Sequence, residues 1–278
     1  GSAAFTLNGL SAHDYPQLPE VEKDHVLTLP VPLFRQVILQ TSIAVSTAES
    51  RPILTGIHMV IANNQLKAVA TDSHRLSQRI IPLEMPETSN ALTFEITLPG
   101  KTLIELSRII DGLETIDFAI TENQVLFQTE TLSFYSRLLE GRYPDTDRLI
   151  NDQFNTAITV VASDLVAAVD RASLMSHTDK NNIATLSINE NRILLTGNSP
   201  EIGKVEEEIT VENYEGTSLD VSFNPDYLKD ALRLFGSSEA TIQFLEANRP
   251  FTLTLKENHS DIPYSFIQLV TPVRTFNG

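Results

Sequence analysis

Apolar and polar residues follow one repeating pattern along the chain, an alternating run followed by a run with apolar residues three and four positions apart. The pattern is clearest at 25–42 (HVLTLPVPLFRQVILQTS) and at 93–110 (TFEITLPGKTLIELSRII), which share the letters TLP. Similar runs return at 157–173 and 219–235. A period of two is typical of strands and a period of 3.6 of amphipathic helices, so each copy predicts a strand, a turn and a short helix.

Alternating runs broken by Asn-rich or charged turns follow each predicted helix, at 56–71, 114–139, 183–197 and 240–258. Such runs predict antiparallel hairpins. Because the strand–helix unit occurs twice in each half of the chain, we expect an α+β fold of repeated domains, each with antiparallel sheets and two helices.

The repeat also predicts the domain boundaries. Residues 23–150 form one copy and 151–278 the next, with EGRYPDTDRLIND (140–152) as the connector. The start of the chain resembles that connector, since Tyr15-Pro16 matches Tyr143-Pro144. We therefore interpret residues 1–22 as the remnant and linker of a missing N-terminal domain.

Composition narrows the class of protein. The chain has 278 residues, of which 41% are hydrophobic and 20% charged, as in an ordinary soluble globular protein. No apolar run approaches the roughly 20 residues that cross a bilayer, so we expect a cytoplasmic protein without membrane contact. The absence of cysteine from the sequence excludes disulfides, thiolate metal sites and a cysteine nucleophile.

The formal charge of −16 argues against a nucleic-acid partner, because phosphate binding needs local positive charge. The four helical runs, however, carry equal numbers of basic and acidic residues, namely Arg35, Lys101, Arg108, Arg171, Lys229 and Arg233 against Glu105, Asp111, Asp164, Asp170, Asp226 and Asp230. A surface built from these helices could face an anion. Charge alone favours the simpler interpretation, ordinary amphipathic helices on a sheet.

The stretch VATDSHRLSQR (69–79) carries the densest set of reactive side chains. A catalytic triad needs side chains that converge from different parts of the fold, whereas consecutive residues such as Asp72, Ser73 and His74 point in divergent directions. The histidines lack metal-ligand spacing, and no Gly-rich phosphate loop occurs, so we expect neither a metal nor a cofactor. Two alternatives remain open, a polar turn capped by Thr71 and Asp72, or a binding surface.

Four motifs together resemble the bacterial DNA polymerase III beta subunit, the sliding-clamp family: RPILTG (51–56), ATDSHRL (70–76), EGRYPD (140–145) and LVTPVRT (269–275). The resemblance covers nearly the whole chain in the same order. It implies a non-catalytic clamp built of three similar domains, of which this chain would hold the second and third. In the family, two protomers close head to tail into a ring around duplex DNA, with short helices lining the hole.

The resemblance also implies partners. Besides double-stranded DNA, these are the DNA polymerase III alpha subunit, the clamp loader, and other polymerases and repair proteins. They insert short peptides rich in Gln, Leu and Phe into a groove between the second and third domains. Carried over position by position, the groove would consist of Leu54, Thr71, Ser73, His74, Arg75, Leu76, Pro144, Arg148, Leu149, Pro250, Leu269, Thr271, Pro272, Val273 and Arg274.

Within that set, Leu54, Leu76, Leu149, Leu269 and Val273 would supply apolar subpockets, while Thr71, Arg75 and Arg148 would bond polar groups of the peptide. Weak, sliding contacts with DNA are expected from Arg51, Lys101, Arg108, Lys229 and Arg233. A homodimeric ring is expected for the full-length protein. It is not expected for this chain, because the first domain would be nearly absent.

Two departures from the family pattern stand out. Ser73 occupies a position that is commonly glycine, and the chain continues as Phe276, Asn277 and Gly278, where Phe276 could reach the groove. The alternative function is a hydrolase or transferase that uses Ser73 and His74.

Overall fold

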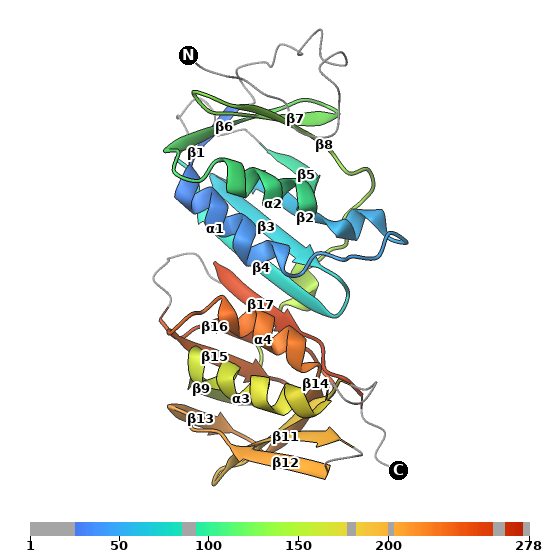
Figure 1. The fold of residues 1–278 in the computed structure, drawn as a ribbon, viewed down its shortest axis with the longest axis vertical. Helices are drawn as coiled ribbons and strands as arrows, with labels where there is room; N and C mark the ends of the chain where they lie inside the picture. Colours follow the sequence, from blue (N-terminus) through green and yellow to red (C-terminus); the bar gives the residue numbers. More distant parts are fainter. Residues whose placement is uncertain (1–25, 85–92, 177–181, 200–202, 258–264, 275–278) are drawn as a thin grey trace. The chain divides into compact units, whose positions relative to one another are not determined.

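The computed structural model describes residues 26–84, 93–176, 182–199, 203–257 and 265–274. The chain forms two compact units (Figure 1). Unit 1 comprises Gly1–Asp72 and Gln78–Pro144, and unit 2 comprises Ser73–Ser77 and Asp145–Gly278. The division after Pro144 falls inside the expected connector. The expected remnant domain, residues 1–22, lies outside the described residues.

Unit 1 contains two helices and two antiparallel sheets. In chain order its elements are β1 (Val26–Pro30), α1 (Val31–Ser42), a 3-10 turn η3 (Pro52–Thr55), β2 (Gly56–Ala62), β3 (Gln65–Thr71), β4 (Arg75–Pro82), β5 (Phe94–Pro99), α2 (Gly100–Ile109), β6 (Thr115–Ile120), β7 (Gln124–Gln128) and β8 (Ser133–Arg137). One sheet has the strand order β1-β6-β7-β8, and the other contains β4-β3-β2-β5. The helices α1 and α2 pack side by side (Figure 1).

Unit 2 repeats this plan. Its elements are a 3-10 turn η5 (Asp147–Leu149), β9 (Thr156–Val161), α3 (Ala162–Ser176), β10 (Ala184–Ile188), β11 (Ile193–Ser199), β12 (Gly203–Glu208), β13 (Asn213–Gly216), β14 (Leu219–Phe223), α4 (Pro225–Arg233), β15 (Glu239–Phe244), β16 (Phe251–Leu255) and β17 (Phe266–Val270). The strands β9-β15-β16-β17 correspond to β1-β6-β7-β8, and β12-β11-β10-β14 to β4-β3-β2-β5. The short strand β13, paired with β9, is an addition without a counterpart in unit 1. The expected α+β fold with two helices in each repeat is confirmed.

The junctions between strands and helices differ from the prediction in one respect. A turn was expected at each junction, but α1, α2 and α3 begin at the residue that follows the strand. Pro30 and Pro99 have φ near −60° and extended ψ, so they end the strand and direct the next residue into the helix. Helix α4 has a separate cap, Asn224, whose side-chain oxygen accepts a hydrogen bond from the backbone N–H of Asp226 at 2.9 Å.

The Asn-rich hairpin turn between β2 and β3 is present. Asn63 and Asn64 have φ of 53° and 58°, the left-handed conformation that tight hairpin turns require. Strand pairing continues directly from this turn, beginning at Ala62 and Gln65. The two asparagines therefore set the register in which β3 pairs with β2, and β3 leads into the 69–79 stretch.

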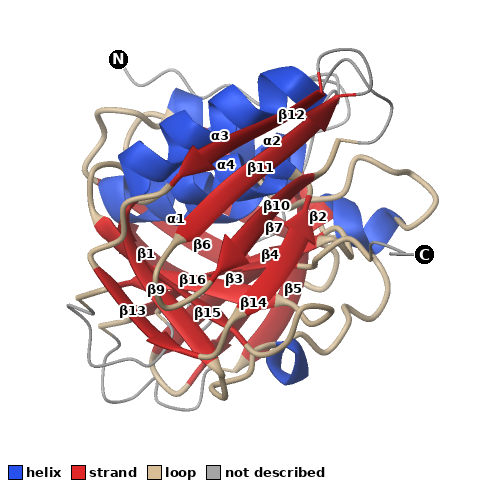
Figure 2. Cartoon of the chain, turned by 90° about the horizontal axis from the view of Figure 1, so that it is seen from below, coloured by secondary structure: helices blue, strands red, loops and turns tan. Residues whose placement is uncertain are grey.

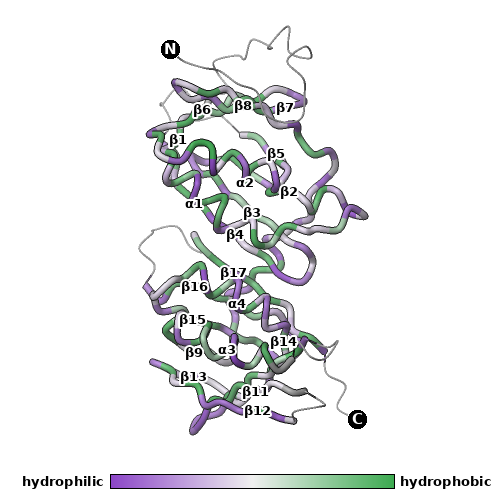
Figure 3. Tube along the Cα trace, in the orientation of Figure 1, coloured by the Kyte–Doolittle hydropathy of each residue, from purple (hydrophilic) through white to green (hydrophobic). Residues whose placement is uncertain are grey.

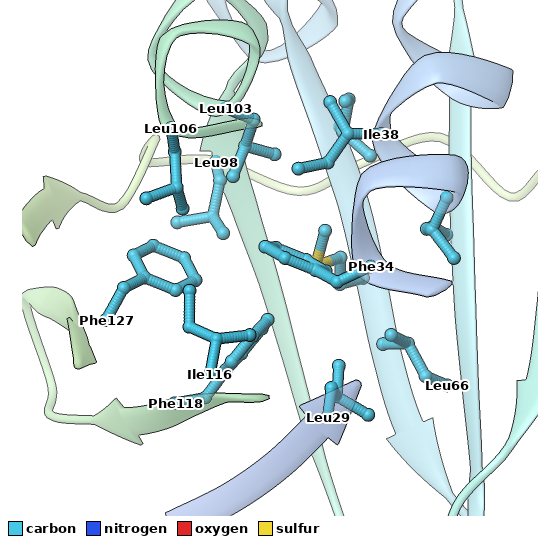
Figure 4. Packing of buried hydrophobic residues seen from close by; sticks show 14 of the residues in the cluster. Leu29, Phe34, Ile38, Leu66, Leu98, Leu103, Leu106, Ile116, Phe118 and Phe127 are labelled. Atoms are coloured by element: carbon cyan, nitrogen blue, oxygen red, sulfur yellow. The ribbon is translucent and has the colours of Figure 1, made fainter. Parts of the chain in front are cut away.

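Each unit buries its own apolar core beneath its helix pair. In unit 1, Phe34 of α1 meets the ring of Phe118 edge-on at 4.7 Å, and Phe127 closes the cluster (Figure 4). In unit 2, Phe251 contacts Phe223 and Phe244, with ring centroids 6.1 and 5.1 Å apart. Hydropathy alternates along α1 and α2, as expected for helices with one buried face (Figure 3).

Helix α3 of unit 2 lies against the sheet that contains β11 and β12. Contacts join α3 to α4, to β11 and to β12, and Figure 2 shows these strands passing in front of the two helices. Gly197 of β11 makes this approach possible, because a Cβ there would lie 2.8 Å from the carbonyl oxygen of Ala172. Among the described residues, no helix is both long and apolar enough to span a membrane.

Candidate functional site

The segment Ser73–Ser77 packs within unit 2, beside the last strand. The carbonyl of His74 accepts a hydrogen bond from the N–H of Thr271 at 2.9 Å, and Ser77 Oγ donates to Gln268 Oε1 at 2.7 Å. The N–H of Val273 in turn donates to the carbonyl of Ser222 at 2.8 Å. The structure thus joins two of the resemblance motifs, ATDSHRL and LVTPVRT, which are far apart in the sequence.

Helix α4 holds the side chains of this segment. Arg75 Nη1 lies 2.8 Å from Asp230 Oδ2, and the guanidinium carbon lies 4.5 Å from the centre of the Tyr227 ring. The same Tyr227 ring stacks with the ring of His74, with 6.0 Å between the ring centroids. These contacts fix the orientation of two expected groove residues. Tyr227 and Asp230 were not predicted as site residues, since only the folded chain brings α4 to this segment.

Ser73 has an unusual backbone conformation. Its φ of 78° lies in the left-handed region, where a side chain is strained and glycine is favoured. This geometry gives a physical reason for the glycine that the family pattern commonly has at this position. The departure at Ser73 therefore adds backbone strain at the start of the segment.

A pocket of about 240 Å³ brings together three further groove candidates, Arg148, Leu149 and Pro250. Its remaining lining residues are Asn151, Gln153, Gln243, Leu245, Arg249 and Thr252, all of unit 2. Leu149 ends the 3-10 turn η5 and is 44% exposed, which is unusual for a leucine in a globular protein. Its side chain is therefore available for contact with a partner.

The groove candidates of unit 1 are held through Tyr143. The Tyr143 hydroxyl accepts a hydrogen bond from the N–H of Thr71 at 3.0 Å, and its ring stacks on His58 at 4.6 Å. Burial raises the pKa of Tyr143 to about 12 and lowers the pKa of His58. These contacts hold Thr71 beside Tyr143, the residue before Pro144.

Several expected groove residues are covered in this structure. Leu54, Leu76 and Leu269 are only 2%, 1% and 4% exposed, so their side chains serve the interior. Pro272 is also buried, whereas Val273 is half-buried and Arg274 exposed. Of the five predicted apolar subpocket residues, Leu149 and Val273 are the accessible ones.

The candidate DNA contacts likewise include both exposed and buried side chains. Lys101 and Arg108 are exposed on α2, where they line a shallow hollow with Thr102, Ile104 and Glu105. Lys229 is 9% exposed, and its ammonium lies 3.1 Å from both Asp170 Oδ1 and Ser173 Oγ. That ammonium is engaged inside unit 2, so Lys229 is poorly placed to meet a phosphate.

The remaining two candidates, Arg51 and Arg233, are both exposed. Arg233 lies 3.7 Å from carboxylate oxygens of Asp170 and Asp230. The expected tail contact of Phe276 lies outside the described residues. Within the described residues there is no group of three His, Cys, Asp or Glu side chains that could hold a metal ion.

Comparison with known proteins gives the family. Residues 28–145 match the model of the DNA polymerase III beta subunit central domain, and 147–268 that of its C-terminal domain. The chain belongs to the DNA polymerase III beta subunit family. A beta sliding clamp from Bacillus subtilis is 42% identical over 278 residues, covering 99% of this chain and 71% of the relative. One from Streptococcus pneumoniae is 43% identical, with the same two coverages.

Solved clamps share the fold. The crystal structure of the DNA polymerase sliding clamp from Bacillus subtilis superposes with a TM-score of 0.87 at 41% identity, covering 96% of this chain and 69% of that one. The beta subunit from Streptococcus pyogenes gives 0.87 at 44% identity, covering 97% and 71%. This beta-subunit chain is therefore a sliding clamp, a non-catalytic processivity factor in DNA replication. The expectation that it is not an enzyme is confirmed by these relatives, and the hydrolase alternative finds no support.

The strain at Ser73 leads to a stability prediction. Replacing Ser73 with Gly should stabilise the clamp by about 1 kcal/mol relative to Ser73→Ala, because both changes remove the hydroxyl but only glycine relieves the positive φ. Urea denaturation of the two variants measures the difference. A Gly variant no more stable than the Ala variant would show that the backbone at residue 73 is unstrained.

Proposed function

We propose that this sliding clamp docks its partners through a short peptide rich in Gln, Leu and Phe, bound by the groove residues named above. The observation that carries the proposal is the hydrogen bond from the Thr271 N–H to the His74 carbonyl at 2.9 Å. This bond joins His74 of one motif to Thr271 of another within unit 2, which supports a shared docking surface. The DNA polymerase III alpha subunit, the clamp loader and repair proteins are the proposed partners, on a homodimeric ring around duplex DNA.

The chemistry of this surface suits a peptide. Leu149 offers an exposed apolar contact, and Val273 a half-buried one. Arg75 is held in place by Asp230 and Tyr227 before any partner arrives, which lowers the entropy lost on binding. We propose that the aromatic end of the peptide lies near Leu149 and Val273. Thr71 and Pro144 stay in the proposal as contacts carried over from the resemblance.

A DNA contact is the second part of the proposal. The exposed cations Lys101 and Arg108 of α2 support it best, and Arg51 and Arg233 are further candidates. Such contacts should be few and weak, because a clamp must slide. We leave Lys229 out, since its ammonium is already paired with Asp170 and Asp226.

Truncating Leu149 tests the peptide surface. Leu149→Ala should weaken binding of a Gln-Leu-Phe peptide by about 1 to 3 kcal/mol, as the loss of an anchoring contact usually does, while the free energy of unfolding should hardly change because the side chain is exposed. Calorimetric titration measures the affinity. The matched control is Leu174→Ala, since Leu174 is 71% exposed on α3 of the same unit. Equal affinities of the two variants would contradict the assignment of Leu149.

Neutralising α2 tests the DNA contact. The double variant Lys101→Gln, Arg108→Gln should weaken duplex DNA binding at low salt and reduce the slope of log K against log salt by about 2, one unit for each lost phosphate contact. Fluorescence anisotropy between low and moderate salt provides both values. Arg137→Gln, at an exposed position in β8 of the same unit, is the control. An unchanged slope in the double variant would remove α2 from the proposed DNA contact.

A further inference from the structure

The pocket beside Leu149 opens on the outer face of the unit 2 sheet. Gln243 of β15 and Thr252 of β16 pair directly across the two strands. Their sequence neighbours Phe244, Phe251 and Leu253 are buried in the core under α3 and α4. Because side chains alternate between faces along a strand, Gln243 and Thr252 point to the opposite side. The floor of the pocket is therefore polar.

Hydrogen bonds hold the wall of the pocket in place. Asn155 Nδ2 donates to the carbonyl of Leu245 at 2.7 Å, and the N–H of Asn155 donates to the carbonyl of Phe244 at 2.9 Å. Closer to the opening, the N–H of Gln153 donates to Asn151 Oδ1 at 2.9 Å. The loop that carries Asn151 and Gln153 is thus tied to the end of β15, and the pocket exists before any ligand binds.

The lining has the chemistry of an anion site. Beside the apolar Leu149, Leu245 and Pro250, it contains two arginines, Arg148 and Arg249, and the amides of Asn151, Gln153 and Gln243, with no carboxylate among the lining residues. Within the described part of the chain, neither guanidinium has an ion-pair partner. Most other cations of unit 2 are paired with acids, namely Arg75, Arg171, Lys204, Lys229, Arg233 and Lys256.

Two guanidinium groups without an ion-pair partner among the described residues are notable in one concave pocket of a chain with net charge −16. Guanidinium and amide donors together match a carboxylate, which accepts several hydrogen bonds at once. The pocket shares Arg148, Leu149 and Pro250 with the proposed peptide surface, at its aromatic end. A peptide that continues past its aromatic residue would therefore enter the pocket.

We infer that the pocket binds the carboxylate of an Asp or Glu that follows the aromatic residue of the partner peptide. The inference rests on the proposed peptide docking and adds a determinant of partner choice. Arg249 is the residue specific to it, because Arg249 does not belong to the proposed groove. A DNA phosphate is the competing occupant. The concave, amide-lined shape and the shared edge with Leu149 favour the peptide carboxylate.

The experiment compares peptides on the intact chain. One peptide carries Glu after the aromatic residue, a second carries Gln there, and a third carries the Glu before the motif. Calorimetric titration at moderate salt should give the first peptide an affinity on the order of tenfold above the other two. In Arg249→Gln this preference should fall to within about twofold, while binding of the Gln peptide stays unchanged. The control Arg192→Gln, an exposed arginine elsewhere in unit 2, should keep the preference.

The outcomes separate the two proposals. If no peptide binds the wild-type clamp, the proposed docking function falls and the inference falls with it. If the Gln peptide binds but Glu gives no gain, or if Arg249→Gln leaves the gain intact, the inference alone is overturned. Loss of duplex DNA binding in Arg249→Gln, with the peptide preference retained, would assign the pocket to phosphate instead.

Discussion

The proposed docking surface depends on one long-range ion pair. Arg75 Nη1 lies 2.8 Å from Asp230 Oδ2, between residues 155 positions apart, and the guanidinium lies against the Tyr227 ring. The Arg75 side chain is only 17% exposed, so solvent screens the pair less than it would an exposed one. Removing Asp230 would take a paired acid away from this largely buried guanidinium. The pair thereby holds the segment after Ser73 against α4. Asp230 also lies 3.7 Å from Arg233.

Charge is distributed by the same pairing. The helical runs carry equal numbers of basic and acidic residues. Within unit 2 some of these opposite charges form ion pairs, since Lys229 is paired with Asp170 and Asp226. Helix cations engaged in this way add little to a field that would attract DNA. On α2, Lys101 and Arg108 stay exposed. Two exposed cations on one helix of an acidic protein are compatible with a clamp that holds DNA loosely.

Much of the fold follows from periodicity, because strands and helices are local structures. The alternating runs and apolar stripes predicted the four strand–helix units, and Asn63-Asn64 predicted the first hairpin turn. The extra strand β13 was missed, since its exposed residues Asn213–Gly216 carry no alternating pattern of burial. The absent turns were missed because Pro30 and Pro99 can end a strand and begin a helix in one step.

The candidate site was less predictable than the fold. The motifs identified His74, Arg75 and Leu149, but neither a motif nor a period links Tyr227 or Asp230 to them. The sequence also does not show which side chains are buried. Leu76 and Leu149 were both predicted as peptide contacts, but Leu76 is buried and Leu149 is exposed. Arg249 was missed for the same reason, since it lines a pocket with Arg148 only in the folded chain. Tertiary contacts, and not local preference, decide which of these side chains meets a partner.

Amide hydrogen exchange with and without a Gln-Leu-Phe peptide tests the central claim, that separate motifs form one docking surface on unit 2, most directly. The account predicts that the peptide slows exchange at 73–77, at 148–153 and at 271–274, and leaves the exposed faces of α1 to α4 unchanged. Protection on the helices, or no protection at any of the three segments, would contradict it.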